Sequence, residues 1–120
     1  MPDSPALSVL IPFFNEAGNV HPVIDEVHEQ LAGINFEIVC VNDCSADATQ
    51  QELAEAAAKH PDTMVVLNHV ERRGKSAALF TGLKSVRGQW VQLLDGDGQN
   101  DPADTARLWK EIIVPGASPR

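Results

Sequence analysis

The sequence has few basic residues, few cysteines and no long apolar run, and each shortage excludes a class of protein. Nine Lys and Arg stand against 17 Asp and Glu. The formal net charge of -8 argues against a nucleic-acid binder, because clustered cations hold phosphate backbones. Cys40 and Cys44 are the only cysteines, and they cannot complete a zinc site. Neither a secretion signal nor a membrane-length apolar stretch is present, so we expect a soluble, cytoplasmic chain.

What remains is suited to a single folded domain. The 120 residues are 43% hydrophobic, which is enough to fill one core, so we assign residues 1–120 to one domain. Only residues 115–120, rich in Pro, Gly and Ser, are typical of a loop-like tail.

Four short apolar runs indicate buried strands. They are rich in β-branched residues and do not alternate with polar ones, as expected of strands covered on both faces. The runs are Leu7–Pro12, Phe36–Asn42, Met64–Asn68 and Trp90–Leu94.

Helical patterns lie between these runs. The first has an apolar stripe from Val20 to Leu31, with Asn19 as N-cap, and the second begins near Asp47 with Gln50 in a capping box. A third helix over Ser76–Val86 should turn four apolar side chains inward, and a fourth should start at Asp101. The inward residues of the third are Leu79, Phe80, Leu83 and Val86.

The alternation predicts an α/β fold with a parallel sheet, in which ligands bind beyond the carboxyl ends of the strands. A polar cluster follows each strand at that edge. The clusters are PFFNE (12–16), NDCSAD (42–47), HVERRGK (69–75) and DGDGQND (95–101). Helix caps and turns account for Asp47 and Asp101 but leave Asp43, Asp95 and Asp97 unexplained.

Asp95 and Asp97 are separated by one glycine, so both carboxylates can reach one hard cation. Carboxylates this close repel each other unless a cation lies between them or one is protonated. The sequence therefore predicts a ligand site. The four histidines show no ligand spacing, and we expect all of them on the surface.

Five blocks together resemble the family 2 glycosyltransferases, and more narrowly the polyprenyl-phosphate sugar transferases of the dolichol-phosphate mannose synthase type. They occur in order along nearly the whole chain. The blocks are PFFNE, VNDCSADAT, GKSAALFTGL, VRG and LLDGDGQNDP. The resemblance implies a GT-A fold, a Rossmann-like architecture whose N-terminal half binds the nucleotide.

The resemblance also implies a set of donor-binding residues. A loop beside the nucleotide corresponds to Pro12, Phe14, Asn15 and Glu16, with Phe14 replacing the usual tyrosine. Asp43 matches the aspartate that holds the base or ribose. A second loop near the nucleotide corresponds to Arg73, Gly74 and Lys75.

Asp95, Asp97 and Gln99 match the element that holds a divalent metal, Mg2+ or Mn2+, and the donor diphosphate. Asp97 would support the leaving group through this metal, and no catalytic residue is identified. The implied partners are a UDP- or GDP-sugar donor and an acceptor. A lipid-phosphate acceptor has an oxygen that is already a nucleophile, whereas an alcohol acceptor would need a general base from elsewhere.

Two features depart from the family's pattern. Cys44 stands where the family commonly has glycine, and Gly98 stands where it commonly has leucine. The family's fold also continues well past this length, and many members carry membrane helices. We therefore expect a truncated domain that binds nucleotide without completing transfer, from a protein working at the inner face of the membrane.

Two alternatives stay open at this point. An apolar strand followed by D-x-D-G also resembles the haloacid-dehalogenase-like phosphatases, in which Asp95 would be a nucleophile and Asp97 an acid/base. The other alternative is a non-catalytic nucleotide-binding or dimerisation module. An open sheet edge would let two copies associate as a homodimer.

Overall fold

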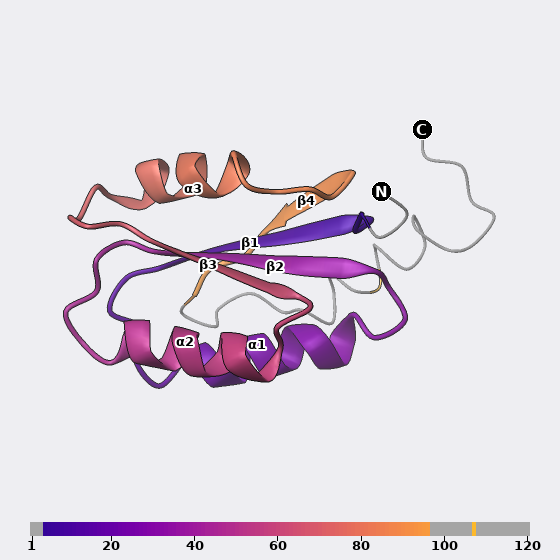
Figure 1. Ribbon diagram of the computed structural model, residues 1–120, viewed down its shortest axis with the longest axis horizontal. Coiled ribbons are helices and arrows are strands. Elements are labelled where there is room, and N and C mark those ends of the chain that lie inside the picture. Colours follow the sequence, from indigo (N-terminus) through magenta and orange to yellow (C-terminus); the bar gives the residue numbers. More distant parts are fainter. Residues whose placement is uncertain (1–3, 97–106, 108–120) are drawn as a thin grey trace.

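A parallel four-stranded sheet lies between two layers of helices in the computed structural model, which describes residues 4–96 and residue 107 (Figure 1). The strands are β1 (Leu7–Phe13), β2 (Phe36–Asn42), β3 (Met64–Asn68) and β4 (Trp90–Leu93). The helices are α1 (Val20–Gln30), α2 (Thr49–Lys59) and α3 (Lys75–Leu83). The predicted α/β alternation is confirmed, and the strand boundaries lie within one residue of those expected.

The order of the strands, β3-β2-β1-β4, creates the place where a ligand can bind. The chain runs outward from β1 through β2 to β3 and then returns to pair β4 with the other edge of β1. Crossovers between parallel strands are right-handed, so this reversal puts α3 on the face opposite α1 and α2 (Figure 1). Where the direction reverses, a crevice opens beyond the carboxyl ends of β1 and β4.

β1 is the centre of the core because both of its faces are covered. Leu7, Val9, Ile11 and Phe13 belong to the cluster shared with α1 and α2. Leu10 points to the other face and packs in the smaller cluster beneath α3. Burial on both faces explains why this strand is continuously apolar in the sequence.

The face that α3 buries differs in part from the one expected. Leu79 and Val86 pack against the core, as predicted. Phe80 and Leu83 were predicted to point inward, but they are 64% and 48% exposed, and this prediction is wrong. Ala78 and Gly82 are buried instead. A Cβ at Gly82 would lie 2.2 Å from Leu10 Cδ1, so the helix approaches the sheet through its smallest residues. Close approach of the α3 backbone to the sheet was therefore favoured over burial of the larger side chains of Phe80 and Leu83.

The helix starts also differ in detail from the expected capping. Asn19 occupies the N-cap position of α1, but its side chain makes no capping hydrogen bond. α2 begins at Thr49 with Ala48 as N-cap, so the capping box from Asp47 is wrong. The Asp47 carboxylate accepts the backbone N–H groups of Thr49 (2.9 Å) and Ala17 (3.2 Å), and thereby joins two loops.

Two further sequence predictions fall outside the described residues. They are the fourth helix from Asp101 and the tail at 115–120. Among the helices that are described, none has the length and apolar character needed to cross a bilayer.

A buried carboxylate connects the strands near their amino-terminal ends, at the end of the sheet opposite the crevice. Glu37, in β2, is 1% exposed and accepts hydrogen bonds from Ser8 Oγ (2.6 Å), from Arg87 N (2.7 Å) and from Arg87 Nε (3.1 Å). Ser8 Oγ in turn accepts the N–H of Gly88 (2.8 Å). These bonds join β1, β2 and the turn before β4, and so set where β4 begins.

Replacing this carboxylate should destabilise the fold. We expect Glu37→Gln to lower the free energy of unfolding by about 2–3 kcal/mol, because an amide places N–H groups against the Arg87 donors and removes the charge. Urea unfolding measures the change. Glu29→Gln, on the exposed face of α1, is the matched control and should change stability by less than about 0.5 kcal/mol. Equal effects of the two substitutions would contradict the role of Glu37.

Candidate functional site

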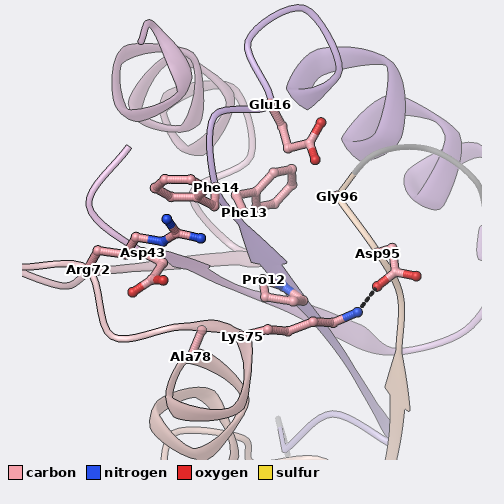
Figure 2. A pocket seen from close by; sticks show the side chains of 10 residues that line it. All are labelled: Pro12, Phe13, Phe14, Glu16, Asp43, Arg72, Lys75, Ala78, Asp95 and Gly96. Carbon is pink, nitrogen blue, oxygen red and sulfur yellow. Dashed lines mark hydrogen bonds and ion pairs between the residues drawn. The ribbon is translucent and has the colours of Figure 1, made fainter. Parts of the chain in front are cut away.

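A pocket of about 420 Å³ occupies the crevice beyond the carboxyl ends of the strands (Figure 2). This volume lies within the usual range for small-molecule sites. The loops after β1, β2, β3 and β4 all contribute to it, as the sequence predicted for its polar clusters. The lining residues are Pro12, Phe13, Phe14, Glu16, Asp43, Arg72, Lys75, Ala78, Asp95 and Gly96.

The loop after β1 places three of its four candidate residues in the pocket wall. Pro12, Phe14 and Glu16 line the pocket, whereas Asn15 does not. Asn15 instead makes hydrogen bonds to the loop after β2. Its backbone, at a φ of 52°, donates to Ser45 Oγ (3.0 Å), and its Oδ1 accepts the N–H of Ala46 (2.8 Å). The loops after β1 and β2 are therefore held together.

Asp43, which follows β2, is a buried carboxylate that accepts three hydrogen bonds. It is 3% exposed. Its Oδ1 accepts from His69 Nδ1 (2.8 Å) and from the N–H of Arg73 (2.8 Å), and its Oδ2 accepts the N–H of Gly74 (2.8 Å). Burial by itself would raise the pKa of Asp43, but these hydrogen bonds outweigh burial and hold the pKa below its usual value. Asp43 is therefore ionised inside the pocket wall.

His69 belongs to this site, although the sequence analysis placed it on the surface. That prediction is wrong, because the His69 side chain is 8% exposed. Its Nδ1 bonds to Asp43, and its Nε2 lies 2.8 Å from Thr81 Oγ1 on α3. The available signal was its position one residue after β3, at the same edge as the other clusters. Histidine spacing along the sequence could not show a partner 26 residues away.

The two cysteines have different environments. Burial raises the pKa of the Cys40 thiol, and Cys40 packs in the core as a small apolar residue. Cys44 follows Asp43 with a φ of 59°, a conformation that favours glycine. The glycine that the resemblance leads us to expect at this position would adopt it without strain.

The loop before α3 places its cations differently from the sequence prediction. Arg72, not Arg73, lines the pocket, and its guanidinium lies 4.0 Å from the centroid of the Phe14 ring (Figure 2). The Arg73 side chain lies 4.0 Å from Glu71, and only its backbone N–H reaches Asp43. Gly74, with a φ of 97°, likewise contributes its backbone N–H.

Lys75 and Asp95 face each other across the pocket. Lys75 Nζ lies 2.7 Å from Asp95 Oδ1, with 64% and 41% of the two side chains exposed (Figure 2). Such exposed ion pairs contribute only about 0–1 kcal/mol, so the lysine can move to another anion at little cost. Gly96 follows, where a Cβ would lie 2.6 Å from Phe13 Cδ1. The strand end is therefore pressed against β1.

Asp95 is the one predicted metal ligand that the structure describes. Asp97 and Gln99 lie outside the described residues, within which no group of three His, Cys, Asp or Glu side chains could hold a metal ion. The Asp95 carboxylate is a hard oxygen donor on the pocket wall, and it already attracts one cation, Lys75. Of the three predicted ligands, the structure thus describes one carboxylate, a hard oxygen donor of the kind that Mg2+ and Mn2+ take as a ligand.

The lowered pKa of Asp43 gives a prediction for stability against pH. Because the folded pKa lies below the unfolded value of about 3.9, the stabilisation is present above pH ~4 and is lost as the pH falls through the folded pKa. We expect Asp43→Asn to lower the free energy of unfolding by about 1.5–3 kcal/mol at pH 7. Its deficit relative to the wild type should shrink toward pH 3.

Urea unfolding at pH 7 and pH 3 measures this difference. Asp25→Asn is the control, because the Asp25 side chain is 63% exposed. It should show a small deficit at both pH values. A deficit for Asp43→Asn that stays constant with pH would contradict the assignment.

Similar proteins were found in both sequence and structure. The sequence pattern described as Glycosyl transferase family 2 matches residues 8–118. "Dolichol-phosphate mannosyltransferase" from Pyrococcus furiosus is 32% identical over 106 residues, covering 88% of this chain and 30% of that protein. "Dolichyl-phosphate beta-glucosyltransferase ALG5A" from Trichomonas vaginalis is 35% identical over 118 residues, covering 92% of this chain and 36% of that protein.

A solved structure agrees with these relatives. "Mannosyltransferase PcManGT from Pyrobaculum calidifontis in complex with GDP-Man and Mn2+" superimposes with a TM-score of 0.78 at 30% identity, covering 92% of this chain and 33% of that one. The chain spans about a third of the length of the relatives it matches. The predicted GT-A type of fold is confirmed. Since the family's pattern covers nearly all of the sequence, the chain belongs to glycosyl transferase family 2.

Proposed function

We propose that this domain binds a nucleotide-diphosphate sugar in the pocket, through a divalent metal, for transfer of the sugar to a polyprenyl phosphate. The observation that carries the proposal is the pocket itself. It lies at the reversal of strand order and combines an ionised Asp43, two cations and Asp95 on its wall. Membership of the family indicates the class of reaction, and the pocket offers the groups that could bind the sugar donor.

The wall near Asp43 suits the nucleoside part of the donor. The Phe14 ring and the Arg72 guanidinium are planar groups on which a base can stack. Asp43 offers a buried carboxylate, which can accept a hydrogen bond from a base N–H or a ribose hydroxyl. The uracil and guanine rings both carry such an N–H group, which is consistent with a UDP- or GDP-sugar.

The wall near Asp95 suits the diphosphate. Lys75 can leave its exposed ion pair and bond a phosphate oxygen, and the proposed metal ligands are Asp95, Asp97 and Gln99. When bound, the metal supplies charge neutralisation for the nucleoside diphosphate that departs. The protein has a net charge of -8, so an anionic ligand needs cations at this position.

The proposed acceptor is a polyprenyl phosphate, as in the names of the relatives. A phosphate oxygen is already ionised at neutral pH, so the acceptor needs no protein base to become a nucleophile. We infer that the transfer takes place at the cytoplasmic side of a membrane. The chain alone, which spans about a third of its relatives, should bind the donor without completing transfer.

The two alternatives fare differently. The phosphatase reading of Asp95 and Asp97 loses its support, because the chain belongs to a glycosyltransferase family. Self-association through an open edge of the sheet stays a prediction, and light scattering tests it.

Calorimetric titration with UDP, GDP, ADP and CDP, each with and without Mn2+, tests the donor site. We expect one diphosphate to bind in a metal-dependent way, and Asp97→Ala to weaken that binding at least tenfold, because the metal would lose a carboxylate ligand. Asp62→Ala is the matched control, since Asp62 is exposed and precedes β3 at the far edge of the sheet. Binding of no diphosphate, or binding unaffected by Asp97→Ala, would overturn the proposal.

A further inference from the structure

The proposed function gives His69 no part in recognising the donor. Its Nδ1 lies 2.8 Å from Asp43 Oδ1, and an ionised carboxylate has no proton to donate, so Nδ1 carries the hydrogen of this bond. Thr81 Oγ1, on α3, lies 2.8 Å from Nε2 and holds the other side of the ring. Only 8% of the His69 side chain is exposed. The imidazole is thus held against Asp43 from both sides.

The hydrogen bonds of Asp43 leave little of its carboxylate for a ligand. Each carboxylate oxygen has two lone pairs and accepts about two hydrogen bonds. Oδ1 already accepts two, from His69 and from the N–H of Arg73, whereas Oδ2 accepts one, from the N–H of Gly74. Among the described residues, these bonds leave one acceptor position, on Oδ2. The 4% exposure of the Asp43 side chain agrees with this count.

The groups near that acceptor position are donors. Two backbone N–H groups already point at the carboxylate, and the Arg72 guanidinium lines the same pocket. The other carboxylates among the described lining residues, Glu16 and Asp95, lie well away from Asp43 (Figure 2). This part of the pocket wall therefore presents a single acceptor position among donors.

Uracil and guanine need different partners from such a wall. The N3–H of uracil is a single donor with a carbonyl on either side, so it needs one acceptor between donors. Guanine presents N1–H and its N2 amino group next to each other, and a carboxylate pairs with both only through both of its oxygens. Because Oδ1 is fully occupied, Asp43 cannot accept both guanine donors. A donor that is buried without a partner weakens binding.

We propose that His69 is a positioning residue that sets the base specificity of the donor site. By occupying Oδ1 of Asp43, it leaves the single acceptor position that suits uracil and does not suit guanine. The inference rests on the proposed function, because it concerns the donor of that reaction, and it narrows the donor to a UDP-sugar. His69 acts through Asp43 and needs no contact with the donor itself.

Calorimetric titration of UDP and of GDP, each with Mn2+, into the chain and its His69 variants tests the proposal. We expect the wild type to bind UDP about tenfold or more tightly than GDP. His69→Asn keeps an N–H donor for Asp43 Oδ1 and should keep this ratio of affinities. His69→Leu is similar in size but has no donor. It frees the position on Oδ1 and should bring the two affinities to within about threefold of each other.

His21→Leu is the matched control. His21 also pairs with a carboxylate, that of Glu55 at 3.2 Å, but it lies on α1 and outside the pocket lining. This variant should leave the ratio unchanged. Structural damage that weakens the binding of both nucleotides alike does not alter their ratio, so a purely structural role of His69 would not produce the expected change.

Two results would overturn the role of His69 and leave the proposed function standing. They are wild-type binding of GDP as tight as that of UDP, and a His69→Leu variant that keeps the wild-type ratio. If His69→Leu is too unstable to titrate, Thr81→Val replaces it. Loss of the bond that orients the ring should lower the ratio about twofold or more, and an unchanged ratio would count against the proposal in the same way. Binding of neither nucleotide to the wild type would overturn the proposed function and this inference together.

Discussion

The buried carboxylate of Asp43 is the contact on which the candidate site depends. It accepts hydrogen bonds from His69 and from the backbone of Arg73 and Gly74, and so connects the end of β2 to the loop after β3 and the start of α3. The loop that carries Arg72 and Lys75 toward the pocket is thereby fixed in place. An ionised side chain this deeply buried is tolerable only because its hydrogen bonds replace those it would make to water.

A second buried carboxylate, Glu37, connects chain segments in the same way at the opposite ends of the strands. It connects Ser8 to Arg87, just before β4 begins. The position of β4 beside β1 determines where Asp95 leaves the sheet, and contact of Gly96 with Phe13 holds that exit close to β1. The two networks thus act at the two ends of β4. One positions the start of β4, and the other positions the loops that face its end.

The strands could be predicted because each is a continuous apolar run, and runs of that kind form parallel strands buried on both faces. The polar clusters could be placed at one edge because a parallel sheet puts all carboxyl ends together. The buried face of α3 could not be predicted. Leu79 packs against the core as its helical spacing predicts, but Phe80 and Leu83 do not. The helix approaches the sheet through Ala78 and Gly82, and its depth depends on Leu10 beneath it. The distance between α3 and the sheet cannot be derived from hydrophobic periodicity.

Sequence alone determined the α/β class, the strand edge that carries the site, and the candidate residues Asp43, Lys75 and Asp95. These follow from local patterns and from a resemblance spread over five blocks. Only the tertiary structure decided that His69 supports Asp43, that Arg72 rather than Arg73 lines the pocket, and that α3 buries Ala78 and Gly82. The physical reason is that these relations join residues distant in sequence, and chain reversal between β1 and β4 brings them together.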